Sequence, residues 1–129
     1  MSQNNAINLP DGVKIAEFRP IAYFDKNMDC IRVLTRDCSV TEHRISEFFT
    51  VLESNYRTNI GPKYVGFTIK GVKQLFHDAG IPFDGTHKLV DIIDKLVKYR
   101  PGSTISAMID LIFTQVQPGD LSVSLDQAA

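Results

Sequence analysis

The chain has 129 residues, of which 43% are hydrophobic and 22% charged, a composition typical of globular proteins and unlike that of disordered or collagenous ones. Its 14 basic and 15 acidic residues give a net charge of −1, which excludes a global attraction to nucleic acid or to an anionic membrane. The two cysteines, Cys30 and Cys38, are too few for a disulfide framework. We therefore expect a cytoplasmic protein with a packed core and free thiols.

The domain organisation follows from the ends of the chain. Residues 1–12 are polar and close with Pro-Asp-Gly, which predicts a flexible tail ending in a turn. We expect a single α+β domain over residues 13–117 and a C-terminal tail over residues 118–129 that can include a short strand. The start of the chain lacks the basic and apolar regions of an export signal, and no apolar run is long enough for a membrane span.

The first predicted elements are strands. Residues 13–18 form a candidate short strand, which Pro20 limits to an edge because proline has no amide hydrogen to donate. The runs 21–24 and 29–36 flank four turn residues, so they predict a β-hairpin in which Asn27 adopts positive φ. Alternation in the second strand places two arginines on one face, which indicates that this face is partly in contact with water.

A helix is predicted over residues 41–54. Ser39, Val40, Thr41 and Glu42 form a capping-box pattern. The apolar residues that follow have helical spacing at i, i+3, i+4 and i+7: Ile45, Phe48, Phe49 and Leu52.

Two further helices are predicted after a short strand at residues 64–67. The first covers residues 69–79, with Thr68 as its N-cap and Gly80 in the left-handed position that ends it. The second covers residues 86–99, where apolar residues form one stripe and Asp/Lys pairs lie outside it.

Residues 104–116 are ambiguous, because their apolar positions fit both a helix and a strand. Their length favours a helix; as a strand they would form a hairpin with residues 121–125. The segment carries more apolar residues than one packing stripe needs, so it forms either a central core helix or a surface buried by a second copy. We therefore expect self-association, most simply as a dimer.

Together these elements predict an α+β fold. A small antiparallel sheet, made of the N-terminal β-hairpin plus one or two short strands, is expected to pack against three or four helices. Such a fold hosts many functions, so it selects none by itself.

The most suggestive region for binding is the basic-aromatic segment, residues 55–76, which contains four cations and no acidic residue. A glycine-bearing loop and a following helix N-terminus can hold a phosphate or carboxylate through backbone N–H groups and cations. The candidate ligand-binding residues are Arg57, Lys63, Tyr64, Lys70 and Lys73. The alternative is a solvated basic face with no ligand.

Three other sites are weaker. Cys30, Cys38 and His43, with Glu47 one helical turn further on, carry metal-ligand atoms, but their spacing matches no regular zinc module. His77 beside Asp78, and His87 four residues before Asp91, provide acid–base chemistry that helix-end interactions explain equally well. Helices 69–79 and 86–99 resemble a DNA-binding pair, but the turn between them is long and the second helix carries two aspartates.

Common catalytic and nucleotide-binding motifs are absent from the sequence. The sequence therefore favours a non-catalytic binding or interaction protein, without a cofactor or bound metal, that holds a small anionic ligand or an acidic partner. The alternatives are a small enzyme with a His/Asp site and a DNA-binding regulator.

Overall fold

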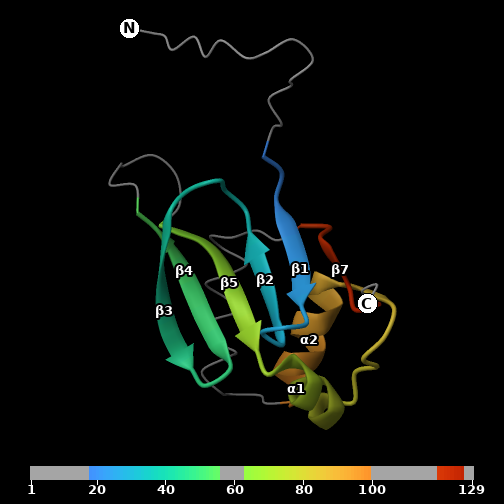
Figure 1. The fold of residues 1–129 in the computed structure, drawn as a ribbon. Coiled ribbons are helices and arrows are strands. Elements are labelled where there is room, and N and C mark those ends of the chain that lie inside the picture. Colours follow the sequence, from blue (N-terminus) through green and yellow to red (C-terminus); the bar gives the residue numbers. More distant parts are fainter. Residues whose placement is uncertain (1–17, 56–62, 100–118, 127–129) are drawn as a thin grey trace, which may run out of the picture.

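The computed structural model describes residues 18–55, 63–99 and 119–126 (Figure 1). A five-stranded antiparallel sheet with the order β1-β2-β5-β4-β3 dominates it, and β6 and β7 form a second, two-stranded sheet. The strands are β1 (Ile21–Asp25), β2 (Cys30–Leu34), β3 (Val40–Ser46), β4 (Phe49–Ser54), β5 (Tyr64–Lys70), β6 (Thr86–Lys88) and β7 (Ser122–Ser124), and the helices are α1 (Val72–Ala79) and α2 (Leu89–Tyr99).

The predicted balance of strands and helices is wrong. Strands make up 43% of the described residues and helices 23%, with two helices in place of the three or four expected. The antiparallel sheet is correspondingly larger than a hairpin with one or two short strands.

The N-terminal hairpin is confirmed as β1 and β2, which pair from Ile21 with Leu34 to Asp25 with Cys30. The Asp25 carboxylate stabilises the turn by accepting hydrogen bonds from the backbone N–H groups of Asn27, at 3.0 Å, and Met28, at 3.1 Å. Positive φ occurs at Asp29, with a value of 51°, and not at Asn27. The left-handed residue is thus the last of the turn, directly before β2.

The predicted helix over residues 41–54 is wrong, because this region forms the β3–β4 hairpin. Strand β4 lies between β3 and β5, and its first four residues are all buried. A strand whose residues are buried on both faces does not alternate strictly between apolar and polar residues. The apolar residues of this segment therefore also fit the i, i+3, i+4, i+7 spacing of a helix, by coincidence. The β-branched residues Val40, Thr41, Thr50 and Val51 favour the strand.

Strand β5 is the centre of the sheet and extends three residues beyond its predicted end. Thr68 is not a helix cap: it lies inside β5, paired with Arg32 on one side and Thr50 on the other. Helix α1 begins at Val72, after Gly71 turns the chain with a φ of 65°.

The predicted end of α1 is confirmed at Gly80, which has a φ of 71°. Its N–H bonds the carbonyl of His77, and the N–H of Ile81 bonds the carbonyl of Phe76. These two hydrogen bonds form a Schellman motif.

The predicted helix over residues 86–99 is correct only from Leu89 onward. Its first three residues form β6, which pairs with β7. The hairpin alternative expected residues 121–125 to pair with residues 104–116; in the structure Ser122–Ser124 pairs with Thr86–Lys88. Residues 104–116 and 1–12 lie outside the described residues.

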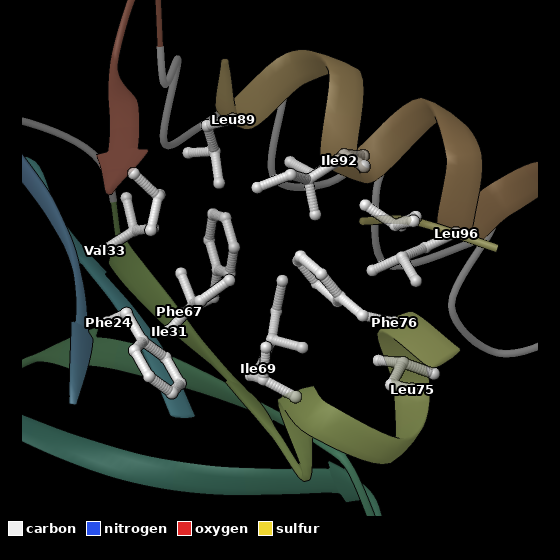
Figure 2. Packing of buried hydrophobic residues seen from close by; sticks show 14 of the residues in the cluster. Phe24, Ile31, Val33, Phe67, Ile69, Leu75, Phe76, Leu89, Ile92 and Leu96 are labelled. Atoms are coloured by element: carbon white, nitrogen blue, oxygen red, sulfur yellow. The ribbon is translucent and has the colours of Figure 1, made fainter. Parts of the chain in front are cut away.

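The main core lies on one face of the five-stranded sheet, beneath α1 and α2 (Figure 2). Phe67 of β5 projects between the helices and is fully buried, and Phe76 of α1 packs beside it. Helix α2 contributes Leu89, Ile92 and Leu96 to the same cluster. Neither described helix is long and apolar enough to cross a membrane.

Candidate functional site

The opposite face of the five-stranded sheet is covered by neither α1 nor α2. In Figure 1, α2 lies behind β1 and β2, and this second face is turned to the viewer. Alternation and strand register place two rows of side chains on it, which we call the open sheet face. The first row consists of Tyr23, Arg32, Thr68, Thr50 and Arg44. The second row consists of Ile21, Leu34, Gly66, Leu52 and Glu42. Lys70 lies on the same face, two residues after Thr68 along β5.

An ion pair crosses the open sheet face. The guanidinium Nη1 of Arg32 on β2 lies 3.1 Å from the carboxylate Oε1 of Glu42 on β3. Strands β5 and β4 separate β2 from β3, so the two backbones are three strand spacings apart, about 14 Å in a flat sheet. The side chains must therefore lie along the surface, and register shifts in β3–β4 and β4–β5 help to curve the sheet between them.

Two threonine hydroxyls lie in the middle of this face. Thr50 and Thr68 are cross-strand partners with 1% and 3% of their surface exposed. Neither Oγ1 atom has a hydrogen-bond partner among the described residues. An unsatisfied buried hydroxyl costs about 1–3 kcal/mol, so two of them side by side are an unusual feature of a sheet.

Three cations surround the two hydroxyls. Arg32 is opposite Thr68 in the register, Arg44 is opposite Thr50, and Lys70 follows Thr68 on the same face of β5. Arg44 also donates from Nε to the backbone carbonyl of Ser46, at 3.3 Å, and this contact fixes its base near the bulge. The centre of the open sheet face thus combines hydrogen-bond donors with positive charge.

Cys30 lies at the margin of this face, opposite Lys70 in the register. Burial raises the pKa of its thiol, and the nearby Asp25 carboxylate raises that pKa further, against the lowering effects of Arg32 and Lys70. A thiol with a raised pKa is a poor nucleophile at neutral pH, so Cys30 is not an activated cysteine. Cys38 is also a free thiol.

The structure does not bring the predicted ligand-binding residues together. Lys63 and Tyr64 lie at the start of β5, whereas Lys70 lies at its end and Lys73 on α1. The six steps from Tyr64 to Lys70 span about 20 Å. Arg57 lies outside the described residues.

Lys63 has local partners at its own end of the sheet. Its ammonium group is 4.0 Å from the Glu53 carboxylate and 5.4 Å from the ring centre of Tyr64. Glu53 also contacts His43 on β3. These contacts link β3, β4 and the start of β5, and they place Lys63 in a local network separate from the Lys70 end.

The start of α1 already has an internal acidic partner. The backbone N–H of Val72 donates to the Asp29 carbonyl at 3.2 Å, and that of Lys73 donates to the Asp29 carboxylate at 3.1 Å. The predicted anion site lay at the N-terminus of a helix over residues 69–79, but the helix starts at Val72. Because Asp29 uses both amides and adds its own negative charge, this helix end opposes a second anion.

The arrangement considered for a metal site is wrong. His43 and Glu47 do not share a helix face, because His43 is in β3 and Glu47 is in the turn that follows it. No group of three metal-ligating side chains occurs within residues 18–55, 63–99 and 119–126.

The histidine–aspartate pairs have ordinary local geometry. His77 Nδ1 is 3.3 Å from the adjacent Asp78 carboxylate on an exposed part of α1. His87 makes its ring contact with the Asp84 carbonyl, at 2.8 Å, and not with Asp91, and its ring packs edge-on against Phe76. The His77 contact matches the predicted helix-end interaction, whereas His87 lies in β6 and not in the first turn of a helix.

Sequence reasoning missed four of the five residues at the centre of the open sheet face, namely Arg32, Arg44, Thr50 and Thr68. Alternation in β2 did indicate that Arg32 faces water, but the incorrect helix over residues 41–54 concealed the other strand register. A strand assignment for β4 would have aligned Thr50 with Thr68 and exposed the cluster.

No family model matches this chain, and the comparisons with curated proteins and with solved structures return no similar protein. The function must therefore be inferred from the geometry of the chain itself.

Proposed function

We propose that this protein is a non-catalytic binding module that holds an oxyanion, such as a phosphoryl or carboxylate group, on its open sheet face. The proposed donors are the hydroxyls of Thr50 and Thr68, and the proposed cations are Arg32, Arg44 and Lys70. This proposal keeps the anionic ligand expected from the sequence but relocates its site, retaining only Lys70 from the predicted set.

The observation that carries the proposal is the pair of buried threonine hydroxyls that have no hydrogen-bond partner among the described residues. Their side chains are fixed in a five-stranded sheet, so they are preorganised donors. An oxyanion accepts from hydroxyl groups, and the resulting charge-assisted bonds are stronger than bonds between neutral groups. A ligand of this kind would satisfy both hydroxyls and would be attracted by the surrounding cations.

The surrounding charge supports an anion over a cation. Among the described residues, Arg32, Arg44 and Lys70 outnumber the two carboxylates of this face, Glu42 and, at its margin, Asp25. Arginine presents a planar set of donors that fits carboxylate and phosphate oxygens, and lysine adds a point charge. The local charge thus favours an anionic ligand although the whole chain is nearly neutral.

The test is a titration of the ¹⁵N-labelled protein with inorganic phosphate and with acetate, followed by amide chemical shifts. We expect shifts centred on Thr50 and Thr68. The double variant Thr50→Val/Thr68→Val should bind about tenfold more weakly or worse, because it loses two hydrogen bonds to a charged group.

The matched control is Lys95→Gln, which removes an exposed cation from α2, the helix that packs on the other side of the sheet. It should bind like the wild type. Equal binding by the double valine variant would mean that water satisfies the hydroxyls and would overturn the proposal. Absence of binding by both probes, or shifts confined to other surfaces, would overturn it as well.

We further propose a cytoplasmic location and self-association. The two free thiols support a reducing compartment. Self-association rests on the apolar segment 105–116, which lies outside the described residues. Native mass spectrometry tests it: a dimer supports the proposal, and a monomer at micromolar concentration contradicts it.

A further inference from the structure

The proposed anion site already contains an acid of the protein itself. Glu42 comes from β3, the edge strand of the sheet, and its carboxylate reaches across to Arg32. The side chain of Glu42 is 53% exposed, whereas that of Arg32 is 27% exposed. The carboxylate is thus the more exposed partner of a pair that links β2 with β3 across the two strands that carry the threonines.

A carboxylate on a guanidinium has the same chemistry as the proposed ligand. Both present negatively charged oxygens to the planar N–H donors of arginine. An incoming oxyanion that uses Arg32 must therefore displace Glu42 or share the guanidinium with a like charge. Either route lowers the apparent affinity of the site.

We infer that Glu42 acts as an internal competitor, which occupies Arg32 in the free protein and is displaced when an oxyanion binds beside Thr50 and Thr68. This inference rests on the proposed function, since it assigns a regulatory role to a residue of the same site. Displacement requires only a rotation of the exposed Glu42 side chain, without a change in the sheet.

The size of the effect follows from the exposure of the pair. Partly exposed ion pairs of this kind contribute at most about 1 kcal/mol, which corresponds to about a fivefold change in affinity. The Glu42→Gln variant should therefore bind inorganic phosphate about two- to fivefold more tightly than the wild type. The matched control is Glu47→Gln, which removes an exposed acid from the β3–β4 turn and should leave the affinity nearly unchanged.

A second variant separates contact from long-range charge. Glu42→Asp keeps the negative charge on β3 but shortens the side chain by one methylene, so that it no longer spans the sheet to Arg32. If Glu42 competes by contact, Glu42→Asp also binds phosphate more tightly than the wild type. If Glu42→Asp behaves like the wild type while Glu42→Gln binds more tightly, long-range repulsion explains the effect and the inference is overturned.

The experiment is the phosphate titration of all four proteins, with the unfolding midpoint of each measured to verify that the fold is intact. Tighter binding by both Glu42 variants than by the wild type supports the competitor role. Equal binding by the wild type and both variants overturns the inference but leaves the proposed function standing. Absence of binding by every variant removes the proposed function and this inference together.

Discussion

The two faces of the five-stranded sheet bury their central residues by different means. On the packed face, apolar side chains of β1, β2, β4 and β5 meet α1 and α2. On the open sheet face, no described helix is present, yet Thr50, Leu52 and Thr68 are as buried as core residues. The Arg32–Glu42 ion pair joins the two sides of this face.

The comparison shows that burial alone does not identify a core. The packed face gains hydrophobic free energy from each buried group. The open sheet face buries two hydroxyls that have no hydrogen-bond partner within residues 18–55, 63–99 and 119–126, and their burial costs free energy that the packed face has to offset. Such a cost is typical of sites that bind a ligand, and it makes opposite predictions for substitutions on the two faces.

The largest effect is expected on the packed face at Phe67. This side chain is fully buried and packs edge-on against Phe49, with ring centres 5.6 Å apart. Phe67→Ala should lower the free energy of unfolding by about 4 kcal/mol, through lost burial and a cavity. Urea denaturation measures it, with the exposed Met28→Ala as a control expected to change little. A loss below that of the control would mean that this core is not formed.

A somewhat smaller loss is expected at Gly66, on the open sheet face. A Cβ added there would lie 2.1 Å from the Val33 carbonyl oxygen of the neighbouring strand. Gly66→Ala should therefore cost about 3 kcal/mol by forcing β2 and β5 apart. Gly71→Ala, where the added Cβ meets nothing within 4 Å but φ is 65°, should cost only about 1 kcal/mol of backbone strain. Thermal unfolding distinguishes the two, and equal losses would contradict the close approach of these strands.

At Thr68 the sign should reverse. Thr68→Val removes a buried hydroxyl that has no partner among the described residues, so stability should rise by about 1 kcal/mol. Thr35→Val is the matched comparison, because the Thr35 hydroxyl donates to the Val65 carbonyl at 3.0 Å and its loss should cost about 1 kcal/mol. Chemical denaturation of both variants tests the difference. A destabilised Thr68→Val protein would show that its hydroxyl is satisfied and that the open sheet face is not strained.

The smallest effect concerns Cys30 at the margin of the open sheet face. Because folding raises the pKa of this thiol, its contribution to stability is complete below the ordinary thiol pKa and is lost as pH rises through the folded-state pKa. In a Cys38→Ser background, the pH dependence of alkylation should give a Cys30 pKa above the ordinary value. Asp25→Asn should lower it while keeping an oxygen acceptor for the turn. A Cys30 pKa at or below the ordinary value would contradict the packing around this thiol.

Local signals predicted several elements correctly. The turn at residues 25–28 between two apolar runs identified the β1–β2 hairpin, and Gly80 followed by Pro82 marked the end of α1. These features depend on residues close in sequence. Glycine in the left-handed conformation and turn side chains act through local hydrogen bonds, so sequence alone reveals them.

The remaining features depended on partners far along the chain. The pattern of residues 41–54 fits a helix locally, but in the structure this segment forms a hairpin that pairs with β5. The pairing with β5 also places Thr68 inside a strand and not at a helix cap. The same tertiary pairing places Thr50 beside Thr68 and directs Arg32 towards Glu42.

The sequence by itself thus determined the β1–β2 hairpin, the end of α1, and a nearly neutral charge without common catalytic motifs. Tertiary structure decided the size of the sheet, the number of helices and the position of the candidate site. The physical reason is that strand pairing supplies hydrogen bonds and burial between residues that are distant in sequence. Together these outweigh local helix preferences, which amount to about 0.5 kcal/mol per residue.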